Sequence, residues 1–214
     1  MTAHSPQRRR FLWQSVLAAL ALANQGRASD WQQGVRRLQG ELLVDGVPTS
    51  AGARIQPGAT LATGPASRTI LVMGQDAYLL GADTQVTFHP AERPEQPLHS
   101  PGLTLQAGRL LSVFGRGQKN LHLPSLSIGI RGTGIYLQSE AGQDYLCLCY
   151  GQADLSRRDQ TAEQEFLDSA YHTARLSQSG QPLRNGPLLN HSDEELFMLE
   201  ALTGRTPSFT DNRY

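Results

Sequence analysis

The stretch RIQPGATLATGPASRTILVMGQDAYLLGADTQVTF, residues 54–88, consists of short apolar runs separated by turn-forming residues. Pro57-Gly58, Gly74-Gln75-Asp76 and Gly81-Ala82-Asp83 supply the positive or preset φ angles that tight turns need. The runs between them lack a helical period and recur at the roughly 8–12 residue spacing of short strands. Because the same pattern extends over residues 40–150, we expect a mainly β domain there, an antiparallel β sandwich or roll.

The chain after residue 150 has a different pattern. Polar residues predict no firm element until HSDEELFMLEALTGRTP, residues 191–207, which has the signals of a helix. Ser192 and Glu195 have the spacing of a capping box, and the leucines that follow lie on one helical face. We therefore predict a C-terminal extension over residues 151–214 that ends in one α-helix at about residues 193–203.

The first residues have the order of an export signal. A basic cluster, Arg8 to Arg10, precedes an apolar run and then small residues, which predicts a signal peptide over residues 1–28, cleaved after Ala23 or Ala28. The Arg-Arg-Arg-Phe-Leu order resembles a twin-arginine signal, whereas the alternative is an ordinary Sec signal with a basic start. Either route predicts a periplasmic protein, and the twin-arginine route exports a chain that has already folded.

Charge and hydropathy restrict the partners. Four of the 19 basic residues and none of the 19 acidic residues lie in residues 1–28, so the mature chain carries a net charge of −4. A chain that is mildly acidic and lacks a basic block is not expected to bind nucleic acid. The apolar run of the signal is shorter than the roughly 20 residues of a membrane span, and no later run is as long, so we expect no transmembrane span after cleavage.

Several of these motifs resemble one family. Pro57-Gly58-Ala59-Thr60, Thr63-Gly64 and the run from Leu105 to Leu110 follow the pattern of a FecR domain. Arg131-Gly132-Thr133, followed by a β-strand, resembles the hallmark of that family. The similarity extends over residues 40–150 and implies a FecR-like β fold.

The resemblance also carries functional expectations. The type members of the family regulate ferric-citrate uptake from the inner membrane, through a cytoplasmic anti-sigma region and a periplasmic sensing domain. Residues 1–10 alone precede the apolar run here, so we expect no cytoplasmic anti-sigma region. The chain is therefore similar to stand-alone, exported FecR-domain proteins, and a link to envelope or iron-related sensing through a separate membrane partner rests on the family association alone.

Two cysteines, Cys147 and Cys149, stand in the stretch DYLCLCYG, residues 144–151. In a strand, residues i and i+2 share a face, so Tyr145 joins the two cysteines on one face. Leu146, Leu148 and Tyr150 are expected on the opposite face, toward the core. The two thiols therefore point toward the C-terminal segment or toward solvent.

Two thiols on one face permit three interpretations. With His172 and His191 from the C-terminal part, Cys147 and Cys149 could hold one transition-metal ion (zinc, copper or iron) in a tetrahedral site. Alternatively they form a strained, reducible disulfide with a redox role, or they are inert buried residues. The sequence leaves these alternatives open.

Other motifs point to structure and not to catalysis. Arg131, Gly132 and Thr133 could bind an anion, but a tight turn is the favoured interpretation. The sequence has no nucleophile elbow, metalloprotease helix, phosphate loop or dinucleotide fingerprint, so we expect no enzyme activity. The sequence hypothesis is a binding or interaction module whose partner is an envelope protein, a sugar polymer or a small ligand. The alternative hypothesis is a metal-binding or thiol-redox protein.

Overall fold

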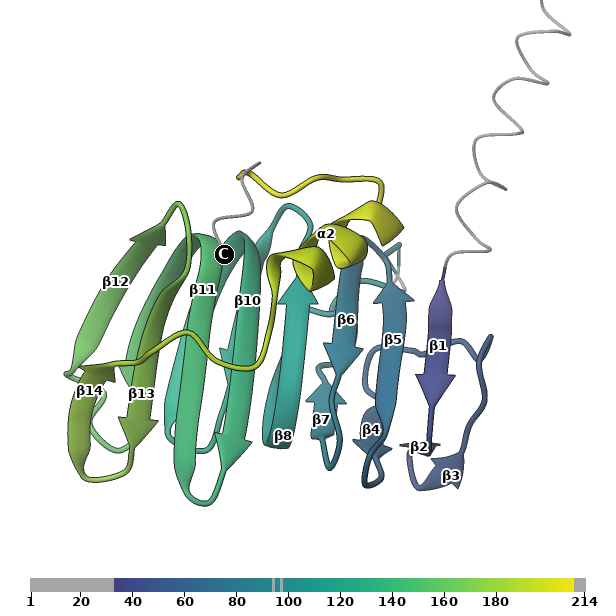
Figure 1. Ribbon diagram of the computed structural model, residues 1–214, viewed down its shortest axis with the longest axis horizontal. Coiled ribbons are helices and arrows are strands. Elements are labelled where there is room, and N and C mark those ends of the chain that lie inside the picture. The colour runs from purple at the N-terminus through teal and green to yellow at the C-terminus, as the bar shows by residue number, and fades with distance from the viewer. Residues whose placement is uncertain (1–32, 94, 97, 210–214) are drawn as a thin grey trace, which may run out of the picture. The chain divides into compact units, whose positions relative to one another are not determined.

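The computed structural model describes residues 33–93, 95–96 and 98–209 (Figure 1). The predicted signal peptide, residues 1–28, lies outside these residues. The described residues from Gly34 onward form one compact unit. Among the residues described, no helix has the length and apolar character that a membrane span requires.

Fourteen strands and one helix make up the part of the chain that is described. The strands are β1 (Gly34–Gln39), β2 (Leu42–Val44), β3 (Val47–Pro48), β4 (Thr60–Thr63), β5 (Arg68–Met73), β6 (Asp76–Leu80), β7 (Gln85–Phe88), β8 (Gly102–Val113), β9 (Gln118–His122), β10 (Leu126–Glu140), β11 (Gln143–Arg157), β12 (Gln164–Ser169), β13 (Thr173–Gln178) and β14 (Gln181–Asn185). Helix α2 (Asp193–Leu202) follows them. The mainly β fold with a C-terminal helix is confirmed.

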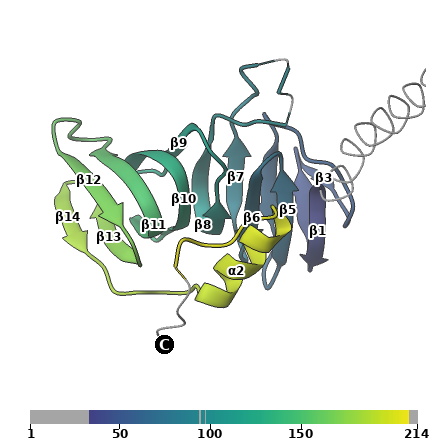
Figure 2. The same ribbon diagram turned by 90° about the horizontal axis from the view of Figure 1, so that it is seen from above.

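All strands belong to one sheet, in which every pair is antiparallel except β8 with β9. The long strands β8, β10 and β11 change partners along their length: β10 pairs first with β9 and then with β8, while β11 pairs first with β13 and then with β12. The sheet therefore folds over into two layers. The first layer contains β1, β5, β6, β13 and β14, the second contains β2, β3, β4, β7, β9 and β12, and the long strands run through both (Figures 1 and 2).

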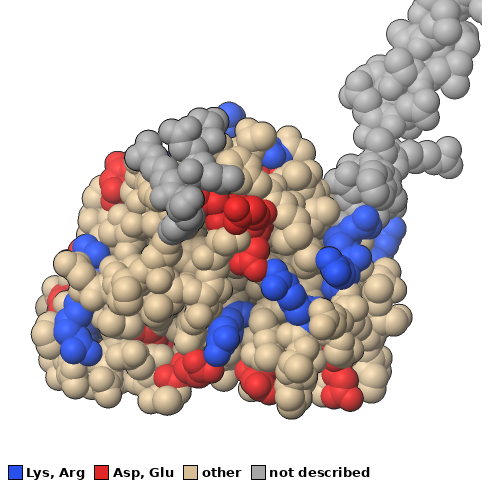
Figure 3. Space-filling model, viewed as in Figure 1, with Lys and Arg blue, Asp and Glu red and all other residues tan. Residues whose placement is uncertain are grey.

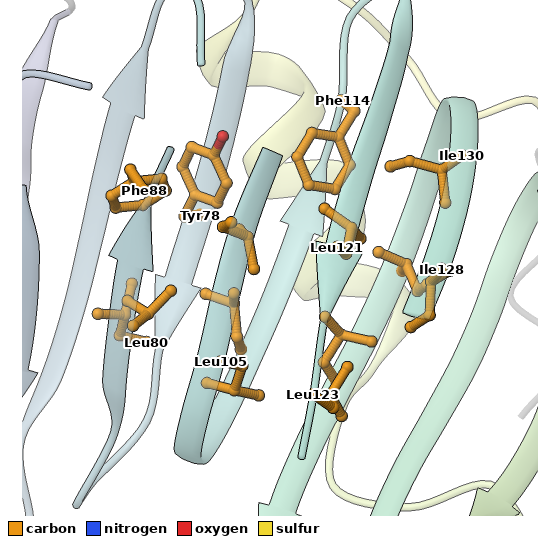
Figure 4. Packing of buried hydrophobic residues seen from close by; sticks show 14 of the residues in the cluster. Tyr78, Leu80, Phe88, Leu105, Phe114, Leu121, Leu123, Ile128 and Ile130 are labelled. Carbon is orange, nitrogen blue, oxygen red and sulfur yellow. The ribbon is translucent and has the colours of Figure 1, made fainter. Parts of the chain in front are cut away.

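An apolar core fills the space between the two layers. Strand alternation sends every second residue of each layer inward, which gives the close packing of Tyr78, Phe88 and Phe114 with aliphatic side chains (Figure 4). One buried ion pair interrupts this core: Lys119 Nζ lies 2.9 Å from Asp76 Oδ2, and both side chains are at most 3% exposed. Lys119 also donates to the carbonyl of Ser100, and Asp76 accepts the backbone N–H of Gly115.

A second apolar cluster lies on the outer side of the first layer, under α2 (Figure 2). Leu196 and Leu199 of the helix are fully buried there against strand residues. The helix begins as predicted: Ser192 is the N-cap, its side chain accepts the N–H of Glu195, and the Glu195 side chain accepts the N–H of Ser192. The capping box therefore fixes where the segment after β14 ends and α2 begins.

A β-bulge in β11 corrects one prediction. Leu148 pairs with Ile135 and Tyr150 with Gly134, so Cys149 is an extra residue between two consecutive partners. Leu146 and Leu148 face the core between the layers, as predicted, but Tyr150 joins Cys149 on the outer side. The prediction that Tyr150 faces the core was wrong, because a bulge turns two successive side chains to one face.

The chain beyond residue 150 contributes much of the sheet. The predicted boundary at 150 falls inside β11, and β12, β13 and β14 continue the two layers (Figure 1). These strands are polar because their outer faces contact solvent, so their apolar alternation is weak. The turn between β12 and β13 and the segment before α2 both reach the face that carries the cysteines.

Candidate metal centre

Four predicted ligand residues meet at one point of the first layer. Cys147 and Cys149 come from β11, His172 from the turn between β12 and β13, and His191 from the segment directly before the N-cap of α2. Their candidate ligand atoms, two Sγ and two imidazole nitrogens, all lie within 4.8 Å of one another. The structure thus assembles the complete predicted set from three separate segments.

The spacing of these atoms suits a single four-coordinate metal ion. Cys147 Sγ lies 3.4 Å from His172 Nδ1, Cys149 Sγ lies 3.5 Å from His191 Nε2, and the two nitrogens are 3.3 Å apart. Tetrahedral zinc with Zn–S bonds of about 2.3 Å and Zn–N bonds of about 2.0–2.1 Å has S···N edges of about 3.5 Å and N···N edges of about 3.3 Å. These three edges therefore have tetrahedral lengths, and the other three are at most 4.8 Å long.

Asp193 orients His172. Its carboxylate, which is fully buried, lies 2.9 Å from His172 Nε2 and accepts a second hydrogen bond from the hydroxyl of Tyr171. Because a carboxylate accepts, Nε2 carries the proton and Nδ1 directs its lone pair at the thiols. The backbone of His172 has a φ of +38° and its N–H donates to the carbonyl of Cys149, which anchors the turn on β11. This is the carboxylate–histidine arrangement that supports metal ligands.

His191 is fixed in the complementary tautomer. Its Nδ1 lies 2.6 Å from the carbonyl of Leu189, which can only accept, so Nδ1 carries the proton and Nε2 is free to ligate. The imidazole stacks on the ring of Tyr136 with 4.6 Å between centroids and 9° between planes. Both histidines therefore aim a ring nitrogen at the same point, where a bound ion would replace the proton that these nitrogens share with their neighbours in the cluster.

The electrostatics favour a bound cation. Hydrogen bonding from Cys149, His172 and His191 lowers the pKa of Cys147 to about 4, against the opposing effect of burial. Burial and the neighbouring Cys147 raise the pKa of Cys149 well above its usual value. For His172, burial lowers the pKa, but the bonds to Cys147 and Asp193 outweigh it and raise the pKa. The lowered pKa favours the thiolate form of Cys147. A divalent ion at the centre of the cluster would stabilise the thiolate form of Cys149 as well.

The site is closed. Both cysteines are 0% exposed and the His172 side chain is 5% exposed. The aromatic rings of Tyr136, Tyr171 and Phe209 surround the two imidazoles. Four protein ligands around one ion would fill its coordination sphere, which is the pattern of a structural metal site.

The other singled-out motif lies apart from this cluster. Arg131, Gly132 and Thr133 form an irregularity in β10, where Gly132 has a φ of +58°. Thr133 is buried and its carbonyl accepts the N–H of Phe114, whereas Arg131 is exposed. The positive φ of Gly132 favours the structural interpretation of the motif.

Sequence reasoning missed the supporting residues. Asp193, Tyr136 and Tyr171 were not singled out from the sequence. Asp193 follows His191 by two residues, so an acidic residue beside a candidate ligand is the signal that could have found it. The two tyrosines have no such signal, because their positions depend on strand pairing.

We expect Asp193→Asn to weaken metal binding by about 10–100-fold, because the amide no longer holds the Nε2 proton of His172 as firmly. Competition with a chromophoric zinc chelator measures this. Tyr171→Phe is the matched control: it removes the other hydrogen bond to Asp193 and is expected to weaken binding less. Equal affinity of Asp193→Asn and the unmodified protein would contradict the role of Asp193.

Comparison with known proteins gives only distant likenesses. No family model matches the chain, and no curated protein matches it. A crystal structure of a candidate anti-sigma factor from Parabacteroides distasonis ATCC 8503 is similar with a TM-score of 0.49 and 8% identity, over 66% of this chain and 64% of that chain. A second crystal structure of a candidate anti-sigma factor from the same organism has a TM-score of 0.48 and 6% identity, over 59% and 58%. The chain thus spans less than two thirds of either protein, and the FecR resemblance stays a prediction from sequence motifs.

Proposed function

We propose that this chain is a zinc-binding β module in which one Zn²⁺ ion, held by Cys147, Cys149, His172 and His191, fastens the C-terminal helix to the sheet. The observation that carries this proposal is the convergence of two thiols and two imidazoles within 4.8 Å of one another, with three of their separations equal to edges of a zinc tetrahedron. The ligand His191 directly precedes the N-cap of α2, and Asp193 is the first residue of that helix. A metal bond at this point therefore holds the start of the helix.

Zinc is favoured among the metals that the sequence left open. Two thiolates and two imidazoles around one ion are a zinc donor set, whereas Cu(II) prefers tetragonal coordination. A two-iron cluster can also take two thiolates and two imidazoles, but it divides them between two iron atoms, whereas the four ligand atoms here all lie within 4.8 Å of one another.

We place this zinc site in an exported interaction module without catalysis. Closed coordination supports a structural role for the metal, and the predicted signal peptide supports a periplasmic location. Bound zinc would also keep two thiols from oxidation in that compartment. Its partner would be an envelope protein or a small ligand. On the face that carries α2, basic and acidic side chains both occur, which fits the expectation that nucleic acid is not the partner (Figure 3).

Elemental analysis of the mature protein, purified from the periplasm without chelators, tests the proposal. We expect about one equivalent of zinc, lost in the Cys147→Ser/Cys149→Ser variant and retained in His89→Ala, whose imidazole lies outside the cluster. Replacement by Co²⁺ should give the absorption of tetrahedral cobalt with thiolate ligands. Protein without metal whose two cysteines are joined in a disulfide would instead support the thiol-redox alternative.

A further inference from the structure

The outer face of the second layer contains a groove along β9, β10, β11 and β12. Strands β9 and β12 lie on the other side of the sheet from α2 (Figure 2). The volume of the groove is about 390 Å³. An adjoining hollow of about 120 Å³ shares Gly129, Asp154 and Phe166 with it and continues past Arg131. The two form a groove longer than one small ring.

Residue size shapes this groove. Strand β10 contributes Ser127 and Gly129 to the floor. Gly129 has an ordinary φ, and a Cβ added there would meet its nearest neighbour, the side chain of Asp154, only at 3.8 Å. His122 of β9 and Phe166 of β12 carry larger side chains on the two outer strands of the groove. Small residues on β10 and larger ones on the outer strands leave the hollow open.

The lining is rich in hydrogen-bonding groups and nearly balanced in charge. His122 is bonded through Nδ1 to Ser127 Oγ, and burial together with Arg158 lowers its pKa, so the imidazole is neutral at neutral pH. Glu165 is held by Arg175 through both carboxylate oxygens. Apart from Glu165, which Arg175 neutralises, the charged residues that line the groove and its extension are Asp154 and Arg131, one of each sign.

Phe166 is the exposed apolar group of the groove. Phe166 is 59% exposed, and it pairs with Asp154 of β11 in the sheet. An aromatic ring directly beside a carboxylate offers an apolar surface and two acceptors at one point. Amide side chains extend this polar surface on both sides, at Asn120, Gln164 and Gln152.

We infer that this groove binds a neutral oligosaccharide, with one sugar ring on Phe166 and its hydroxyls on Asp154 and the flanking amides. The charge of the groove argues for this class of ligand: one carboxylate opposes an acidic polymer, and one arginine opposes a cationic one. Amides and hydroxyls pair with the many hydroxyls of a sugar, and a ring face is the apolar surface that Phe166 can cover. This inference does not depend on the zinc site.

Native affinity electrophoresis of the full mature chain tests the inference. Gels contain one of four neutral polysaccharides (hydroxyethyl cellulose, laminarin, glycogen or glycol chitin), or polygalacturonate as an acidic comparison. We expect at least one neutral polymer to retard the protein. Calorimetry with a hexasaccharide of that polymer then gives the affinity. Retardation by none of the four, or by polygalacturonate alone, overturns the inference.

Two variants locate the binding. Phe166→Ala removes an exposed ring and Gly129→Leu fills the floor, and each is expected to weaken binding at least about tenfold. Val47→Ala is the matched control, because Val47 is also an exposed apolar residue, at 63%, but lies on β3 outside the groove. Circular dichroism and thermal melting check that each variant is folded. If both variants are folded and bind the oligosaccharide with unchanged affinity, the sugar binds elsewhere and this groove is not its site.

Discussion

If the cluster holds zinc as proposed, removing the ion under reducing conditions is expected to release the segment from Gly186 to Phe209 while the sheet stays folded. The helix of this segment has only ten residues, too few to be stable alone, and its N-terminal end is held by His191. The core between the layers contains none of the ligands, so it should persist. Hydrogen exchange should accelerate in α2 and remain slow in β4 and β7.

The thermal stability should fall at the same time. A ligand present at 1,000 times its Kd stabilises the folded state by about 4 kcal/mol, so its removal should lower the Tm of a chain of this size by about 8–16 °C. The Cys147→Ser/Cys149→Ser variant is the control, since a chelator should change neither its exchange nor its Tm. Equal protection of α2 with and without zinc in the unmodified protein would falsify the fastening role.

Replacing Lys119 by Met is expected to destabilise the protein by about 3–5 kcal/mol, because it leaves the buried carboxylate of Asp76 without its cation. Chemical denaturation measures the change in the free energy of unfolding. Arg109→Met is the matched control: Arg109 pairs with Glu140 at 3.2 Å, but both side chains are about half exposed, at 45% and 54%. Breaking that pair should change the stability by at most about 1 kcal/mol.

The double variant Lys119→Met/Asp76→Leu separates the pair from the packing around it. If the uncompensated carboxylate causes the loss, removing both charges should recover much of it. A double variant that is less stable than Lys119→Met alone would instead show that the hydrogen bonds of Asp76 to Gly115 and Tyr78 matter more than the ion pair.

The parts of the fold that could be predicted are those with local causes. Turn residues such as Gly74 and Asp83 adopt positive φ angles between strands, and the capping box at Ser192 begins the helix where predicted. The alternation of Tyr145 and Cys147 with Leu146 followed directly from the pleat. Each of these depends on residues within a few positions of one another.

The parts that could not be predicted depend on pairing between distant segments. The bulge at Cys149 is set by the approach of Tyr150 to Gly134, where a Cβ would lie 2.4 Å from the tyrosine ring. The strands after residue 157 are polar because one face is solvated, so their composition resembles that of loops. The sequence places Asp193 beside His191, but its bond to the distant His172 forms only because the helix docks on the sheet.

The candidate ligand set could be predicted in part, from its residue types but not from its geometry. Residue type selected Cys147, Cys149, His172 and His191, since thiolate and imidazole are the soft donors of the chain. Their spacing matches no standard finger, because the sheet and not a short loop brings them together. The chemistry was therefore visible in the sequence, and the geometry was not.

The order of strands in the sheet has a consequence for self-association. The sheet ends at β3 and β14, and each of these strands contains a proline, Pro48 and Pro182, which cannot donate to a further strand. The two branches end at β1 and β12, which carry charged residues such as Arg37 and Asp168. Every open edge thus opposes the addition of a strand from another molecule, so the protein should resist amyloid-like stacking even at high local concentration.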